Sequence, residues 1–402
     1  MEGSQLNNLS LVLDLGQSYL RLGYSGDAEP RLETSSYYGV SARSMILEEL
    51  PDAAAPTIGE QISRPKFVFG KEMDQVSPGF TYKPIMKGVG EVPDKEFISV
   101  FAEQLVSTMS IEQRSMPLLL SEDNMLKKEE RYAYLQLFLE TGVVPQIFLA
   151  RKSLLSMYAC GKTTGAVLDS GSYSTSISTF EEGFFVSEGY SSITFGGEHI
   201  TEKIMEQLSD DPAQLLSQEQ LGGSRDPETV SLDPTQVEYH KRMLARKIKH
   251  TLLAPDVVPG CNYLLPDGSK MTLNDSVHQL AASMFKTSDL TKTSSLHELL
   301  VGSVNKLLNC KLETKMFGSM ILTGGNTSLG TYAESCRRDI QEVSTKLGLG
   351  SKTFSFPNER IRSNCVMIGG SILCSIDNHL QYFVSKQDLS EFGDTVVERK
   401  LL

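Results

Sequence analysis

Two stretches of this sequence decide its fold: LVLDLGQSYLRLGY at Leu11 to Tyr24 and AVLDSGSYSTSIST at Ala166 to Thr179. Each is an apolar run that ends in an aspartate (Asp14 and Asp169), followed by a turn of small residues and a second alternating run. Alternation on both sides of a glycine-containing turn is typical of a β-hairpin. The repetition of this device within one chain predicts a duplicated α/β fold.

The composition of the two turns favours a phosphate site. Glycine and serine allow backbone N–H groups to point into a shared space, so two facing hairpins would hold a polyphosphate from both sides. The two aspartates would then hold a hydrated divalent cation. Either motif alone is equally compatible with an ordinary surface hairpin, and only the duplication favours the ligand site.

Length and charge bound the class of protein. A chain of 402 residues is long enough for two or more domains. A formal net charge of −12 argues against wrapping of nucleic acid by this chain, and it is compatible with docking onto a basic partner segment. No apolar run reaches membrane length, so we expect a soluble intracellular protein without a membrane anchor.

The six cysteines show neither C-x-x-C spacing nor clustering with histidine. They are Cys160, Cys261, Cys310, Cys336, Cys365 and Cys374. This spacing predicts buried, small apolar side chains in a reducing compartment.

The order of elements along the chain is hairpin, helices, hairpin, helices, which predicts two αβ halves, each a mixed sheet covered by helices. Leu32 to Ser63 has no sustained period and is expected to be loop or a small peripheral subdomain. Ser209 to Asp233 is polar and rich in turn residues, as in an insertion.

Two Gly-Gly pairs are expected to form turns. Gly324-Gly325-Asn326-Thr327 follows an apolar strand, and its bare backbone would let a nucleotide lie against a helix N-terminus. A Gly-Gly turn alone more often serves close packing. Gly369-Gly370 is predicted to be a second turn that feeds an apolar helix.

Seven further motifs fall in the order and spacing of the actin superfamily, which the chain resembles along nearly its whole length. They are YKPIMKG (Tyr82 to Gly88), LLLSEDN (Leu118 to Asn124), SLLSMYACGKTTGAVLDSG (Ser153 to Gly171), YLLPDG (Tyr263 to Gly268), ILTGGNTS (Ile321 to Ser328), MIGGSILCSI (Met367 to Ile376) and VSKQDL (Val384 to Leu389). The resemblance implies an actin-like fold of four subdomains around a nucleotide cleft. It divides the chain into a first half (1–160), a second half (161–362) and a segment that returns to the first half (363–402).

The resemblance also implies a cleft site for ATP with Mg²⁺. Asp14 and Asp169 take the positions of the carboxylates that organise the cation. The residues implied for the cofactor are Asp14, Gly16, Gln17, Ser18, Arg21, Asp169, Gly171, Ser172, Gly197, Gly324, Gly325, Asn326 and Thr327.

Departures from the actin pattern cluster in this cleft. Arg21 stands where actins place a phosphate-facing lysine, and its planar fork differs in geometry. Lys152 replaces the glutamine that orients the attacking water, and a lysine cannot accept a hydrogen bond from that water. The other replacements are Ser172, Tyr173 and Ser176 near the phosphates, and Ser363 and Ile248 near adenosine. Any one change is compatible with neutral drift. Together they predict lost hydrolysis, with no catalytic residue, and leave nucleotide occupancy open.

Three short features resemble the nuclear class, actin-related protein 4: Arg21, the GGNT turn and VERK at Val397 to Lys400. Members of that class are subunits of chromatin-remodelling and histone-acetyltransferase complexes, where they pair with actin or another relative on a long helix of the motor subunit. The loop by which actin grips its filament neighbour is unrecognisable between Val40 and Pro65. The resemblance therefore implies a nuclear, non-filamentous interaction subunit.

A partner groove follows from the same resemblance, with walls that would take an amphipathic helix. Its residues are Tyr158, Ile372, Leu373 and Ile376, the last three on one predicted helical stripe. Ordinary core is the alternative for all four. Two further functions stay open: a filament-forming ATPase, and a cytoplasmic actin-related protein of a motor-adaptor filament.

Overall fold

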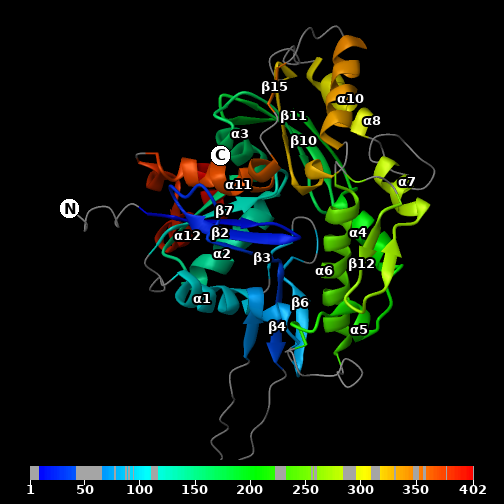
Figure 1. Ribbon diagram of the computed structural model, residues 1–402. Coiled ribbons are helices and arrows are strands. Elements are labelled where there is room, and N and C mark those ends of the chain that lie inside the picture. The colour runs from blue at the N-terminus through cyan, green and yellow to red at the C-terminus, as the bar shows by residue number, and fades with distance from the viewer. Residues whose placement is uncertain are drawn as a thin grey trace, which may run out of the picture.

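Two large mixed sheets, each with its own helices, face each other in the computed structural model (Figure 1). The structure describes residues 9–41, 66–76, 78–86, 88, 91–93, 95–109, 116–221, 232–254, 257, 260–283, 296–308, 317–329, 332–346, 353–355, 359–376 and 378–401. The predicted duplicated α/β fold is confirmed. Both hairpins that predicted it are present, one in each sheet.

The first sheet has six strands in the order β16-β8-β7-β1-β2-β3. They are β1 (Leu11–Leu15), β2 (Tyr19–Tyr24), β3 (Leu32–Ser35), β7 (Leu118–Glu122), β8 (Gln146–Arg151) and β16 (Val384–Ser385). The helices grouped with it in Figure 1 are α1 (Lys95–Met109), α2 (Lys128–Glu140), α11 (Glu359–Leu373) and α12 (Lys386–Phe392). The short helix α13 (Val396–Lys400) packs on α2 and α12. β1 and β7 are buried throughout, as expected for central strands covered on both faces.

The second sheet has five strands in the order β11-β10-β9-β14-β15. They are β9 (Gly165–Ser170), β10 (Thr175–Glu181), β11 (Phe184–Ile193), β14 (Ser319–Thr323) and β15 (Thr353–Ser355). The helices of this half are α4 (Gly197–Met205), α5 (Pro212–Leu215), α6 (Pro234–Leu252), α7 (Asp275–Ser283), α8 (Leu296–Leu308) and α10 (Tyr332–Lys346). A separate hydrophobic core lies in each half.

Two small sheets complete the described chain. The strands β4 (Tyr37–Ser41), β5 (Phe67–Phe69) and β6 (Phe80–Pro84) form one, with a 3-10 turn at Gly70–Asp74 beside it. The strands β12 (Asn262–Leu264) and β13 (Lys270–Thr272) form the other. Short 3-10 turns also lie at Gly325–Ser328, His379–Tyr382 and Gly393–Thr395.

The long helix α6 begins at Pro234. Asp233 caps it, because its carboxylate accepts the N–H of Thr235 at 2.9 Å, and Pro234 occupies the first turn. This cap fixes where the cations further along α6 lie relative to the cleft.

The helix α3 (Lys152–Ala159) is the first passage between the halves, since it connects β8 of the first sheet to β9 of the second. It packs closely on α11. A Cβ atom at Gly369 would lie 1.7 Å from the carbonyl oxygen of Leu155, so this glycine permits the helices to approach. The expectation of a turn at Gly369-Gly370 is therefore wrong: α11 runs through both residues.

The structure also differs from expectation in two segments of the chain. Within Leu32 to Ser63, β3 joins the large first sheet and β4 joins a small one, while 42–63 lie outside the described residues. Within Ser209 to Asp233, Leu215, Leu216 and Leu221 are buried in the second core, because α5 packs there, so the described part is no surface insertion.

The cysteines also differ from the expectation of uniform burial. Cys261 is exposed and Cys160 is half-buried, Cys310 lies outside the described residues, and the other three are buried. No helix in the described part of the chain is long and apolar enough to cross a membrane.

Candidate functional site

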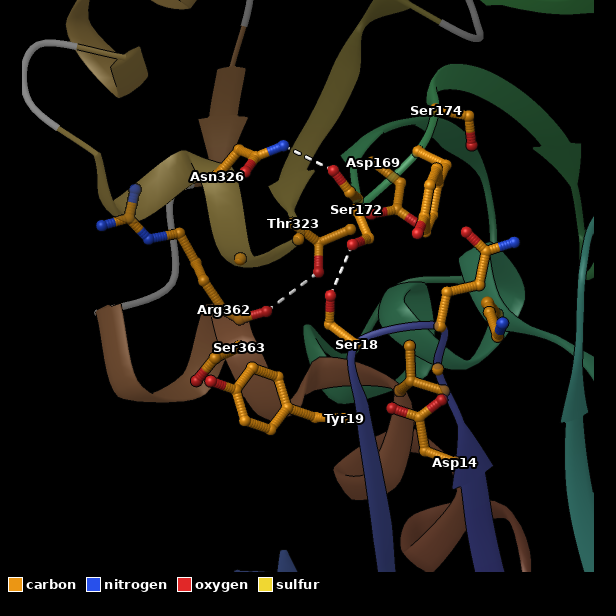
Figure 2. A pocket seen from close by; sticks show the side chains of 18 of the residues that line it. Asp14, Ser18, Tyr19, Asp169, Ser172, Ser174, Thr323, Asn326, Arg362 and Ser363 are labelled. Carbon is orange, nitrogen blue, oxygen red and sulfur yellow. Dashed lines mark hydrogen bonds between the residues drawn. The ribbon is translucent and has the colours of Figure 1, made fainter. Parts of the chain in front are cut away.

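The two aspartates lie near the carboxyl ends of two core strands, one in each large sheet. Ligands of open α/β sheets bind at this edge. Asp14 is the fourth residue of β1, which runs parallel to β7. Asp169 lies near the end of β9 and is paired in register with Thr323 of the parallel strand β14. All three residues line one cleft between the two halves (Figure 2).

Asp14 is buried and already has polar partners. The hydroxyl of Ser121 donates to its Oδ1 at 2.8 Å, and Arg21 Nη1 lies 3.6 Å from its Oδ2. Arg21 also reaches Glu33, with Nε 3.2 Å from Oε2. In this arrangement the Arg21 guanidinium, which lines the cleft, is held by two carboxylates.

The turns of the two hairpins touch across the cleft. Ser18 of the first turn and Ser172 of the second are hydrogen-bonded through their hydroxyls (Figure 2). Within each turn a glycine N–H closes the hairpin: Gly16 donates to Tyr19 O at 3.1 Å, and Gly171 to Ser174 O at 2.9 Å.

A buried carboxylate extends this bridge into α6. Glu198 accepts from Ser172 Oγ at 3.4 Å and pairs with Arg242 and Arg246, the latter at 3.0 Å. Arg246 in turn donates to the Ser18 carbonyl at 3.2 Å. Burial raises the pKa of Glu198, but the charges of Arg246, Arg242 and Lys249 outweigh burial and hold that pKa below its usual value. The first turn is thus tied to the second half through charged side chains.

The turn at Gly324 supplies the third wall. Gly324 has φ of 96° and a Cβ there would lie 2.2 Å from Ser170 O, so only glycine fits this approach. Asn326 donates to the carbonyl of Gly171 and to Ser170 Oγ, which joins this wall to the second hairpin.

Eleven of the thirteen residues predicted for the cofactor line the cleft. They are Asp14, Gly16, Gln17, Ser18, Arg21, Asp169, Gly171, Ser172, Gly324, Gly325 and Asn326. Gly197 and Thr327 lie behind its wall. The carbonyl of Gly197 accepts from Lys249 at 3.0 Å, and the Thr327 hydroxyl donates to Gly324 O at 2.6 Å.

Lys152 lines the cleft and is mostly buried. Its Nζ donates to Asp123 Oδ1 at 2.8 Å, and only 15% of its side chain is exposed. Burial lowers the pKa of this lysine, but the charges of Asp123 and Asp14 outweigh that effect and raise it. This part of the cleft therefore holds an ammonium ion, which donates hydrogen bonds and accepts none.

Asp169 has a perturbed carboxyl group. Burial raises its pKa to about 6, and the like charges of Asp123 and Asp14 act in the same direction against that of Lys152.

Tyr173, in the turn of the second hairpin, also lines the cleft, and its side chain packs against His199. Its ring lies edge-on to that of His199, with centroids 6.5 Å apart, and burial raises its pKa to about 12.

The assignment of Ile248 to the adenosine site is wrong. Ile248 is fully buried in the second core, and its neighbours on α6, Arg246, Lys249 and His250, line the cleft. Successive helical residues point about 100° apart, so an alignment error of one or two positions exchanges core and cleft side chains. Ser363 lines the cleft as expected.

The cleft is cationic although the molecule is acidic. Its lining includes five lysines and arginines and three aspartates: Arg21, Lys152, Arg246, Lys249 and Arg362 against Asp14, Asp123 and Asp169. Arg246, Lys249, His250 and Arg362 were absent from the predicted set, because nothing in a helical sequence says which charged side chains turn inward. An excess of cations in a concave site favours a polyanionic ligand.

Direct contacts also join the halves at the outer rim of the cleft. Tyr239 of α6 packs edge-on against Tyr37 and Tyr82, with ring centroids 5.4 and 5.1 Å away. Its hydroxyl lies 3.1 Å from Ser35 Oγ, and the N–H of Tyr82 donates to Thr235 at 2.8 Å. Figure 1 shows β4 and β6 beside α6.

The fold and site define a class: an α/β protein of two halves, with a polar cleft between two hairpins of the same form. The model of the actin family, described as "Actin", matches residues 5–402, and the chain belongs to this family. The predicted actin-like fold is thereby confirmed.

Similar curated proteins include actin-related protein 4 from Oryza sativa subsp. indica, 24% identical over 437 residues, which cover 97% of this chain and 98% of the relative. Actin-related protein 4 from Arabidopsis thaliana is 25% identical over 435 residues, with the same two coverages. The predicted similarity to actin-related protein 4 is confirmed.

The predicted groove residues gather at the α3–α11 end of the molecule. Ile372 and Ile376 are 42% and 56% exposed, while Tyr158 and Leu373 are half-buried. Ile376 does not lie on the helix as expected. The helix α11 ends at Leu373, and Ile376 follows in a tighter turn in which its N–H bonds to Leu373 O. Tyr382, 40% exposed, was not predicted.

Proposed function

We propose that this chain is a non-filamentous, catalytically inactive actin-related protein that serves as an interaction subunit of a nuclear chromatin-remodelling or histone-acetyltransferase complex. The nuclear role rests on the similarity to actin-related protein 4 and on the sequence features of that class. We also propose that residues 1–160 form the first half of the molecule, that 161–362 form the second half, and that 363–402 return to the first half.

The observation that carries the loss of hydrolysis is the Lys152–Asp123 ion pair. Hydrolysis in this fold needs a group that accepts a hydrogen bond from the attacking water, and a lysine ammonium offers donors only. Its pairing with Asp123 at 2.8 Å also engages a second cleft carboxylate. Loss of a positioned acid–base group typically costs ~10²–10⁴-fold in rate.

The cleft residues fit ATP with Mg²⁺, which actin-family proteins bind. Asp14, Asp123 and Asp169 provide the hard oxygen ligands that Mg²⁺ prefers, and Asp14 and Asp169 are those we assign to the cation. Arg21, Arg246 and Arg362 supply positive charge for phosphates. A bound metal would balance the charge of the polyphosphate; binding would require the Ser18–Ser172 contact to separate or the phosphates to lie beside it.

The proposed partner is actin or another actin-related protein, together with an amphipathic helix of a motor or scaffold subunit. Exposed Ile372, Ile376 and Tyr382 beside half-buried Tyr158 provide an apolar surface on an acidic molecule. A helix with an apolar stripe and basic flanks complements both properties.

A phosphate-release assay tests the loss of hydrolysis. Pure protein with Mg²⁺ and ATP should release phosphate at a rate at least a hundredfold below that of conventional actin assayed in parallel. Steady release at the actin rate would contradict the proposal and favour the filament-forming ATPase. Nuclear exclusion of the tagged protein would instead favour a cytoplasmic motor-adaptor role.

A further inference from the structure

Two cysteines meet where the chain passes between the halves. Cys160 caps the C-terminus of α3, and Cys365 lies on α11. The thiols of these residues are hydrogen-bonded to each other. They are separated by more than two hundred residues of sequence, so only the packing of the two helices brings them together.

The packing explains this meeting. Leu155 of α3 lies against Gly369 of α11. Cys160, five residues after Leu155, meets Cys365, which is four residues before Gly369. The two helices are therefore antiparallel and in close contact. The absent side chain at Gly369 sets their separation, because any Cβ there would collide with the α3 backbone.

The two thiols differ in environment. Cys160 is half-buried and Cys365 is buried, so an oxidant from solution reaches Cys160 first. The hydrogen bond from Cys365 lowers the pKa of Cys160, and the charge of Lys162 acts in the same direction against burial. The same hydrogen bond, together with burial, raises the pKa of Cys365. A half-buried thiol whose pKa is lowered, with a buried thiol beside it, is the arrangement of an attacking and a resolving cysteine.

We propose that Cys160 and Cys365 form a peroxide-sensitive thiol pair that closes to a disulfide and fastens α3 to α11. The Cys160 thiolate attacks one oxygen of hydrogen peroxide, forming a sulfenic acid and releasing hydroxide, which takes up a proton as water. Cys365 then loses its proton and attacks the Cys160 sulfur, displacing the hydroxyl group as a second water. Two thiols are oxidised, one peroxide is reduced, and a thiol reductant reverses the change.

The location gives the bond a mechanical consequence. The helix α3 connects the two large sheets, and α11 follows β15 of the second sheet but packs on β1 and β2 of the first. A covalent link between these two passages restricts rotation of one half against the other. Ser363 and Val366, which flank Cys365 closely on α11, line the cleft, so the link lies directly beside the ligand site.

The test is a peptide map of the full-length protein, reduced, freed of reductant and treated with equimolar hydrogen peroxide under conditions where circular dichroism shows it folded. We expect a linked peptide containing Cys160 and Cys365 in the wild type and in the matched control Cys261→Ser, which removes the exposed cysteine. The link should disappear on reduction. Absence of the linked peptide from folded, oxidised wild-type protein would by itself overturn the proposal.

Two variants test the order of events. With dimedone present, Cys365→Ala should accumulate a sulfenic acid adduct at Cys160, and Cys160→Ser should leave Cys365 unmodified. Adduct formation at Cys365 in the second variant, or oxidation of Cys261 in preference to Cys160 in the first, would contradict the assigned roles. In the wild type, oxidation should also slow amide hydrogen exchange in 152–161, and unchanged exchange would contradict the mechanical consequence.

Discussion

At the scale of single residues, the site is shaped by charges that satisfy one another inside the cleft. Asp14 is held by Arg21 and Ser121, Asp123 by Lys152, and Glu198 by two arginines of α6. Each pairing reduces the cost of burying charge without a ligand. Asp14, Asp123 and Glu198 therefore already have protein partners.

Removal of Lys152 tests this view at the level of stability. Lys152→Met leaves the Asp123 carboxylate without its cation, and we expect a loss of about 2–3 kcal/mol in the free energy of unfolding. Adding Asp123→Asn should recover part of that loss, because the neutral amide needs no counter-charge. Urea denaturation of the two variants and of Asp123→Asn alone measures the coupling. Strictly additive losses would mean that the pair is not coupled.

At the scale of elements, the hairpins were predictable and the faces of α6 were not. The apolar run to Asp14 or Asp169, the small turn and the following alternation are local signals, so the strands and their ends follow from the sequence. Which residues of α6 reach the cleft depends on tertiary packing. That is why Ile248 was misplaced, while Arg246, Lys249 and His250 were missed. Gly369 was similarly misread, because close helix approach leaves no local mark that separates it from a turn.

The helix α6 also carries a buried histidine that makes stability depend on pH. His240 is 2% exposed, and its Nε2 has no hydrogen-bond partner among the described residues. Burial, with the charge of Lys247, lowers its pKa to about 4 from the ordinary 6.5. The unfolded chain therefore takes up a proton below about pH 6.5 that the folded protein takes up only near pH 4.

The contribution of neutral His240 to the free energy of unfolding is therefore complete above pH 6.5. It is lost as the pH falls towards 4, and the total loss is about 3 kcal/mol. His240→Phe should flatten the fall in the free energy of unfolding between these pH values while keeping the ring beside Tyr239. Urea titrations at pH 7.5, 6, 5 and 4 measure the slope. An identical slope in wild type and variant would contradict this account of His240.

At the scale of the whole molecule, the two halves are joined both at the α3–α11 passage and at the outer rim. The rim contacts of Tyr239 with Tyr37, Tyr82 and Ser35 join the halves at a place separate from the passage. We expect these two sets of contacts to fix the relative orientation of the halves. No short-range pattern in the sequence predicted these contacts, because they join segments about 150 to 200 residues apart.

Removal of the rim aromatic should loosen this orientation. Tyr239→Ala deletes a buried ring and should cost about 3–5 kcal/mol, with an increased radius of gyration in small-angle scattering. Tyr239→Phe is the matched control; it keeps the ring, loses one hydrogen bond and should cost about 1 kcal/mol without change in the radius. Equal radii for wild type and Tyr239→Ala would show that the rim does not hold the cleft closed.

The proposed role of this chain is docking onto partner subunits, and co-purification measures that role. Tagged protein from nuclear extract should retain an actin-family partner and the motor or scaffold subunit, whereas Ile372→Asp/Ile376→Asp should stay folded but lose them. Burial of these two side chains would contribute ~1.5–3 kcal/mol each. Leu264→Asp, at a distant residue that is 65% exposed, is the control and should retain the complex. Full retention of the complex by the double variant would contradict the claim.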